Sequence, residues 1–198
     1  MSELAKRISP TNPNKSNIVI SIDAMGGDNG PTAVISGIEI AAKSNPNIKF
    51  IINGDKAQLE KLVGNRKNLN KICEIRHSPD VISMNDKPSH AMRHGKNSSM
   101  WGTIDAVKDK DADAAVSCGN TGALMAISMI RLRKLPGVYR PAIAILWPSA
   151  SELGFNFMLD VGADIRADAP DLLKYALMGA SYARNGFGLK RPRVGLLN

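Results

Sequence analysis

Cysteine is nearly absent from this chain of 198 residues, which contains only Cys73 and Cys118. The two lie far apart and neither belongs to a CxxC pair, so the sequence indicates neither a zinc site nor a disulfide framework. Proteins that do without disulfides are typical of reducing compartments. A cytoplasmic location is therefore expected.

Aromatic residues and long apolar runs are also scarce. Aromatics make up 5% of the chain, too few for the stacking surface of a single-strand-binding protein, and no nucleic-acid partner is expected. No apolar run approaches the length of about 20 residues that spans a bilayer as a helix. The polar N-terminus lacks the hydrophobic core of a signal peptide, and residues 1–17 are expected to form a flexible tail.

Positive charge is in excess. Lys and Arg number 26 against 18 Asp and Glu, a net charge of +8. This excess favours anionic partners, which include phosphate, an acidic protein, an anionic lipid surface and nucleic acid, and charge alone does not choose among them. Hydrophobic residues make up 43% of the chain, a fraction typical of a folded globular domain.

Short apolar segments alternate with helical patterns along the chain. This alternation predicts an α/β fold with a mostly parallel sheet and helices on both faces, a three-layer α/β/α arrangement. A helix is expected over residues 171–184, and a short helical piece within 79–96. The expected strands are residues 18–23, 48–52, 72–76, 112–117, 142–146 and 157–161, and the other helices are 32–42, 56–63, 99–110 and 123–133.

The last segment, residues 193–198, has the pattern of a buried strand that stops at its carboxyl end. In an open α/β sheet the loop after such a strand usually carries site residues. The sequence therefore predicts one α/β domain over residues 18–198 that is incomplete at its C-terminus.

A glycine-rich turn joins the first strand to the first helix. It contains Asp23, Gly26, Gly27 and Asp28, and adjacent glycines at a helix start let backbone N–H groups approach an anion. The alternative is a plain turn in which Asp28 or Asn29 caps the helix. The spacing matches neither the dinucleotide fingerprint nor the P-loop.

A second turn of the same kind follows the strand over residues 112–117. Gly119, Asn120, Thr121 and Gly122 combine backbone flexibility with neutral donors, which suit an oxyanion or a phosphate. A capped turn is again the alternative. Cys118 in this turn is more often a small buried hydrophobe than a nucleophile.

The segment of residues 87–100 concentrates cations and hydroxyl groups. Arg93 offers a planar fork for phosphate and Lys96 a point charge. His90 and His94 would share one side of a helix, but no third ligand lies nearby for zinc. Ser98 and Ser99 precede a helix. A solvated basic loop is the alternative interpretation.

Asp160 ends the strand expected at residues 157–161 and precedes a glycine. Its carboxylate could orient a basic side chain or cap the next turn, and the pattern does not decide between them.

These motifs occur together in a fixed order, which is more specific than any one of them. With them the chain resembles the PlsX family of bacterial phosphate acyltransferases from about residue 18 to its end. The segments that carry the resemblance are residues 23–31, 88–93, 98–100, 119–123, 140–142 and 160–163.

The resemblance implies an activity and an assembly. Such enzymes transfer a fatty acyl group from acyl carrier protein to inorganic phosphate, giving acyl phosphate for phospholipid synthesis. It also implies a Rossmann-like fold related to phosphotransacetylases and isocitrate-dehydrogenase-type enzymes, a homodimer, and peripheral association with the inner face of the membrane. Family members continue past Asn198 and usually have Ala in place of Cys118, which argues against a cysteine nucleophile.

The implied reaction exchanges a thioester for an acyl phosphate, so it requires no ATP, metal or other cofactor. The protein must hold phosphate against the carbonyl and stabilise the oxyanion. We expect Arg93, Lys96, Asn120 and Thr121 to be catalytic. The substrate-binding residues are then Asp23, Gly26, Gly27, Asp28, Ser98, Ser99, Gly119, Gly122 and Asp160. The alternatives are an acyl-CoA-dependent phosphotransacylase and a non-catalytic module that binds anions or lipid.

Overall fold

The computed structural model describes residues 17–64, 66–138, 141–161 and 167–197. The chain divides into two compact units, one of residues 14–133 and one of residues 134–198 with 1–13. We describe each unit by itself. Except for Asn17, the N-terminal tail expected from the sequence lies outside the described residues.

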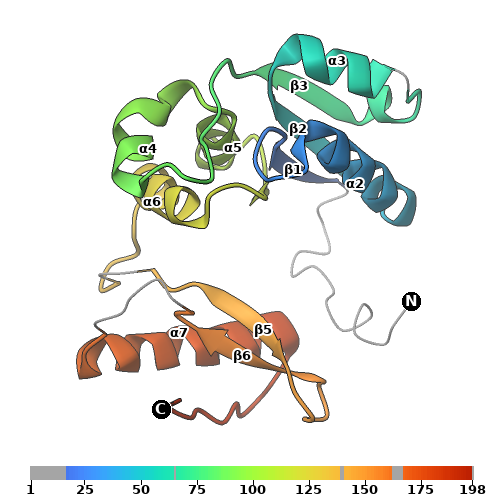
Figure 1. The fold of residues 1–198 in the computed structure, drawn as a ribbon. Coiled ribbons are helices and arrows are strands. Elements are labelled where there is room, and N and C mark those ends of the chain that lie inside the picture. The colour runs from blue at the N-terminus through green and yellow to red at the C-terminus, as the bar shows by residue number, and fades with distance from the viewer. Residues whose placement is uncertain (1–16, 65, 139–140, 162–166, 198) are drawn as a thin grey trace. The chain divides into compact units, whose positions relative to one another are not determined.

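The larger unit is built on a four-stranded parallel sheet with the order β3-β2-β1-β4 (Figure 1). This confirms the mostly parallel α/β fold expected from the alternation of segments. The strands are β1 (Ile18–Asp23), β2 (Ile48–Gly54), β3 (Cys73–His77) and β4 (Ala114–Ser117). The helices are α2 (Gly30–Ser44), α3 (Lys56–Gly64), α4 (Pro88–His94), α5 (Ser99–Lys108) and α6 (Thr121–Leu132), with 3-10 turns η1 (Leu69–Lys71) and η2 (Gly95–Asn97).

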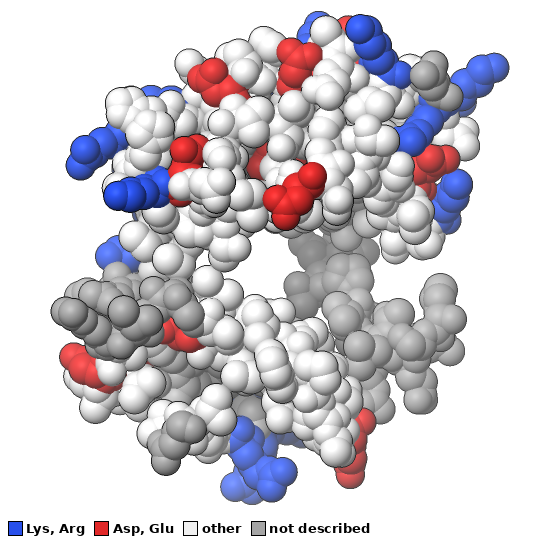
Figure 2. All heavy atoms as spheres, in the orientation of Figure 1, with Lys and Arg blue, Asp and Glu red and all other residues white. Residues whose placement is uncertain are grey.

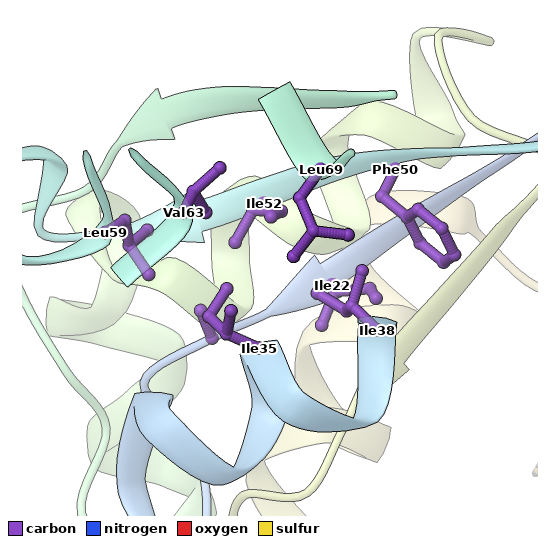
Figure 3. Packing of buried hydrophobic residues seen from close by; sticks show 9 residues of the cluster. Ile22, Ile35, Ile38, Phe50, Ile52, Leu59, Val63 and Leu69 are labelled. Carbon is purple, nitrogen blue, oxygen red and sulfur yellow. The ribbon is translucent and has the colours of Figure 1, made fainter. Parts of the chain in front are cut away.

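Alternate residues of each strand enter two different cores, because successive side chains of a strand point to opposite faces. On one face Ile22 and Ile52 pack against α2, α3 and η1 in an aliphatic cluster (Figure 3). On the other face Ile51 packs against Ala106 of α5. Helices therefore cover both faces of the sheet, as a three-layer fold requires.

A buried amide joins the sheet to α5. Asn53 at the end of β2 is 1% exposed. Its Nδ2 group donates to Ser21 Oγ at 2.9 Å and to Thr103 Oγ1 at 3.1 Å. Because a buried amide is costly unless its hydrogen bonds are made, this network fixes how α5 sits on β1 and β2.

The helices α5 and α6 are joined by packing and by charge. Ile104 of α5 and Ile127 of α6 are buried in one cluster. Arg131 of α6 donates to Asp105 of α5 at 2.5 Å and lies over the Trp101 ring at 5.5 Å. These contacts hold the middle and the last turn of α6 against α5.

The smaller unit is a β-hairpin packed on a long helix. Strands β5 (Ala144–Pro148) and β6 (Phe155–Leu159) pair antiparallel, and α7 (Ala169–Phe187) crosses them. A Cβ atom at Gly179 of α7 would lie 2.8 Å from Leu159 Cδ1 of β6, so the helix packs closely on this strand. Among the described residues, no helix combines the length and the apolar character needed to cross a bilayer.

Two expectations about the C-terminal part are wrong. The strands expected at residues 142–146 and 157–161 do not extend the parallel sheet but pair with each other in a hairpin. Residues 193–197 form no strand, and Leu196 and Leu197 are exposed. Apolar β-branched patterning predicts the local preference, but a strand forms only where another strand offers hydrogen-bond partners.

Replacing Asn53 by Ala should lower the free energy of unfolding by about 2 kcal/mol or more, because the buried hydroxyl groups of Ser21 and Thr103 lose the Nδ2 donor. Asn45→Ala is the matched control, since Asn45 Nδ2 donates to Ala41 O at 3.1 Å in an exposed position. The control should cost less than about 1 kcal/mol. Urea denaturation measures both, and equal losses would contradict a special role for the Asn53 network.

Candidate active site

The strand order creates a single point where the direction of winding reverses. From β1 the chain passes through α2 to β2 and β3 on one side, and then returns to place β4 on the other side of β1. Ligands of open α/β sheets bind outside the carboxyl ends of the strands at such a switch point. The two glycine-rich turns follow β1 and β4, so both lie at this edge.

The turns of residues 23–30 and 117–122, the paired glycine turns, lie against each other. A Cβ atom at Gly26 would be 2.9 Å from Gly119 N. Gly27 has a φ of 95°, and a Cβ atom on it would lie 2.9 Å from Cys118 O. Side chains at either position would therefore force the turns apart, which explains why glycine stands at both.

A buried carboxylate connects the paired glycine turns. Asp23 is 1% exposed, and its Oδ1 accepts the N–H groups of Met25 at 3.2 Å and Gly26 at 3.1 Å. Its Oδ2 accepts the Ser117 hydroxyl at 2.7 Å, and Ser117 Oγ accepts the Gly119 N–H at 3.0 Å. Asp23 thus shapes both turns from within, and its charge is satisfied by protein donors.

Sequence reasoning missed Ser117. The signal was present, because Ser117 ends β4 as Asp23 ends β1, and the two residues are direct partners in the parallel register.

Some backbone donors at this edge have no acceptor among the described residues. The N–H groups of Gly27 and Asn120 donate no hydrogen bond to another described residue. Asn29 stands at the N-cap position of α2, but its side chain makes no capping bond. The positive ends of α2 and α6 lie at the same edge. The arrangement can bind an oxyanion without using a cation.

Asn120 does not offer its side chain to a ligand, contrary to its expected role as a donor. Its Oδ1 caps α6 by accepting the Ala123 N–H at 3.0 Å. Its Nδ2 is within hydrogen-bond distance of the carbonyl groups of Ser83, Met84 and Asp86, between 2.8 and 3.2 Å. Asn120 therefore positions the loop before α4, and its own backbone N–H is the group left for a ligand.

Thr121 and Gly122 open α6 in different surroundings. Thr121 is exposed at the first residue of the helix. A Cβ atom at Gly122 would lie 2.8 Å from Pro88 Cγ, so this glycine lets α4 pack on the start of α6.

Ser98 and Ser99 are both 1% exposed. The Ser98 hydroxyl donates to Gly95 O at 2.6 Å and accepts the Trp101 N–H at 3.2 Å, so Ser98 caps α5. Both serines lie beneath the surface rather than on the site edge, and this burial favours a structural role for them.

The structure does not bring Arg93 to the paired glycine turns. Ala91 is the buried residue of α4, and the ring of the exposed Pro88 meets Gly122, whereas Arg93 lies on the opposite side of the helix. There it lines an open hollow of about 370 Å³, the α4 hollow. Its lining residues are Asn85, Asp86, Lys87, Ser89, His90, Arg93 and His94.

The other expected site residues are dispersed. Lys96 lies exposed in η2, outside the α4 hollow. Asp28 is exposed in the first turn, and Cys118 is exposed rather than buried as expected. Asp160 belongs to the smaller unit, where it follows β6 with a φ of 61°.

Within the described ranges, no group of three or more His, Cys, Asp or Glu side chains could hold a metal ion. The site chemistry described above rests on amide and hydroxyl donors.

Comparison with known proteins agrees with the motif order. A family model described as "Fatty acid synthesis protein" matches residues 18–198. The chain belongs to this family.

Two relatives named phosphate acyltransferase are similar over most of the chain. The chain is 67% identical over 180 residues to a phosphate acyltransferase of Jannaschia sp. (strain CCS1), covering 91% of the chain and 49% of that relative. It is also 62% identical over 195 residues to a phosphate acyltransferase of Cereibacter sphaeroides (strain ATCC 17025 / ATH 2.4.3), covering 98% of the chain and 53% of the relative. The chain spans about half the length of the curated relatives it matches.

The substitution Gly26→Ala tests the contact between the turns. Its methyl group would lie 2.5 Å from Asp23 Oδ2 and 2.9 Å from Gly119 N, so the free energy of unfolding should fall by about 2 kcal/mol or more. Gly37→Ala in α2 is the control, because nothing lies within 4 Å of its added Cβ. The control should be neutral or stabilising by up to about 1 kcal/mol. If chemical denaturation shows the same change for both, the turns do not depend on close approach.

Proposed function

We propose that the complete protein transfers a fatty acyl group from acyl carrier protein to inorganic phosphate, producing acyl phosphate for phospholipid synthesis. The observation that carries this proposal is that the paired glycine turns lie in close contact at the switch point of the sheet. The chain also belongs to a family described as "Fatty acid synthesis protein". The relatives named phosphate acyltransferase support the same reaction class.

The chemistry places one main demand on the site. A phosphate oxygen attacks the thioester carbonyl carbon and forms a C–O bond, and the C–S bond then breaks. The carrier leaves as a thiolate that takes a proton from solvent. Between these steps the former carbonyl oxygen carries a negative charge, and donors fixed in advance stabilise that charge more than the ground state.

The donors assigned to this oxyanion are the N–H groups of Gly27 and Asn120, with Thr121 at the positive end of α6. Asp23, Ser117 and the Asn120 side chain are positioning residues, since their hydrogen bonds shape the turns rather than face a ligand. Gly119 allows the close approach of the turn at Gly26, and Gly122 allows the close approach of α4. Removing one fixed donor from such a site typically costs on the order of 3 kcal/mol in the barrier.

Exposed cations act at longer range in this proposal. Because Arg93 faces the α4 hollow and Lys96 lies in η2, they raise the local concentration of phosphate and of an acidic carrier protein rather than touch the reacting atoms. Asp28, on the rim of the first turn, then limits which anions approach. We further propose that the complete protein is a homodimer located in the cytoplasm, peripheral to the inner face of the membrane.

The deciding assay uses the complete protein with acyl-acyl carrier protein and measures thiol release with and without inorganic phosphate. Phosphate-dependent release, together with a product that hydroxylamine converts to a hydroxamate, supports the proposal. Competition with acyl-CoA in the same assay identifies a CoA-dependent enzyme if CoA is the preferred donor. Thiol release that does not depend on phosphate would reject phosphate as the acceptor and indicate hydrolysis of the thioester. No thiol release at all would leave a non-catalytic module that binds anions or lipid.

The substitution Thr121→Asp separates stability from catalysis. A carboxylate in the first turn of α6 interacts favourably with the helix dipole, so the free energy of unfolding should stay constant or rise by up to about 1 kcal/mol. The same charge repels phosphate, and the KM for phosphate should rise on the order of tenfold to a hundredfold.

Thr121→Asn is the neutral control of similar size and should change the KM for phosphate by less than about threefold. Steady-state kinetics over a phosphate series and thermal unfolding measure the two effects. Wild-type phosphate kinetics in Thr121→Asp would remove the start of α6 from the phosphate site.

A further inference from the structure

The α4 hollow is a cationic depression whose residues do not touch the reacting atoms in the proposed reaction. Lys87 and Arg93 line it, and within the described ranges neither forms an ion pair. In the space-filling view, Lys and Arg side chains project at the edge of the larger unit where Figure 1 draws α4 (Figure 2). Exposed cations without protein partners are free to bind an anion.

Two histidines add ring N–H donors to the lining of this hollow. The rings of His90 and His94, one turn apart on α4, have centroids 4.7 Å apart. A neutral imidazole ring still offers one N–H donor to an anion beside it. The single carboxylate in the lining, Asp86, accepts the Ser83 N–H at 2.8 Å and so is held toward the loop backbone.

The wall of the α4 hollow is fixed rather than loose. The Asn120 amide holds the carbonyl groups of Ser83, Met84 and Asp86, and Pro88 packs against Gly122. The loop that presents Lys87 is therefore anchored to the first turn of α6. A preformed wall lowers the entropy cost of binding a ligand.

The volume of the α4 hollow and its uncharged polar lining residues indicate a ligand larger than a single inorganic ion. About 370 Å³ lies within the range of small-molecule pockets and exceeds what one tetrahedral anion fills. Ser89 and Asn85 add a hydroxyl and an amide to the lining, and both groups suit a polar alcohol.

From this geometry we infer that the α4 hollow binds phosphate esters of small polar alcohols. The phosphate group contacts Arg93 and Lys87, the histidine pair flanks it, and the alcohol part reaches Ser89 and Asn85. This site is separate from the paired glycine turns, and its ligand binds whether or not the proposed acyl transfer is correct.

Histidine NMR of the full chain provides the readout, because the chain has only three histidines, His77, His90 and His94. His77 is an internal control, since it ends β3 and its Nδ1 accepts the Lys56 N–H at 3.3 Å, away from the hollow. Titrants are glycerol 3-phosphate, inorganic phosphate and glycerol at constant ionic strength. We expect glycerol 3-phosphate to shift the His90 and His94 signals with saturation and to leave His77 unchanged.

The variant Arg93→Gln should weaken this binding about tenfold or more. Arg93 is exposed and forms no described ion pair, so the variant should fold, and an unchanged His77 signal verifies this. Lys61→Gln, an equal loss of charge on the exposed part of α3, is the matched control and should bind as the wild type does.

The inference is overturned if glycerol 3-phosphate causes no saturable shift, or if Arg93→Gln and Lys61→Gln weaken binding equally. It is also overturned if inorganic phosphate binds as tightly as the ester, because the alcohol part then has no site. None of these results bears on acyl transfer, whose test is phosphate-dependent thiol release by the complete protein.

Discussion

The carboxylate of Asp23 is the interaction on which the rest of the site depends. It is buried at the end of β1 and takes its hydrogen bonds from Met25, Gly26 and Ser117. A buried charge without such donors would be strongly destabilising. The turns must therefore adopt the one arrangement that satisfies it, and this arrangement brings Gly26 against Gly119. A buried carboxylate thus shapes the turns from within, and its hydrogen-bonding capacity is taken up by the protein's own donors.

The fold of the larger unit could be predicted from the sequence because local pattern and tertiary environment agree there. The run of residues 18–23 is apolar on both faces, and the strand it forms is covered by helices on both faces. The same reasoning was wrong for residues 193–197, which are as apolar but have no strand beside them in the structure. The hydrophobic pattern of a segment indicates which of its side chains can be buried. Whether a partner strand lies next to it depends on the whole topology.

The position of the candidate site could be predicted from the sequence, but the hydrogen-bond partners of its side chains could not. Strand–turn–helix junctions at adjacent parallel strands indicate where ligands bind, and both glycine turns lie there. The roles of Asn120 and Ser98 could not be read in the same way, because a polar side chain in a turn can face a ligand or the chain itself. In both cases the backbone takes the hydrogen bonds. Helical spacing could have separated Arg93 from the turns, since Pro88 and Arg93 fall on opposite sides of α4.

The two anion-directed features of the larger unit differ in kind, and the difference suits different tasks. Amide groups in the paired glycine turns are neutral and held by hydrogen bonds, so they lose little energy in reorganising when charge develops during a reaction. Cations in the α4 hollow are exposed to solvent, which favours capture of ions from solution over stabilisation of a short-lived charge. The Asn120 side chain connects the paired glycine turns with the α4 hollow. Its Oδ1 caps α6, and its Nδ2 group holds the wall of the α4 hollow. A ligand that tightens that wall also restrains the first turn of α6, where the N–H groups of the proposed oxyanion site begin.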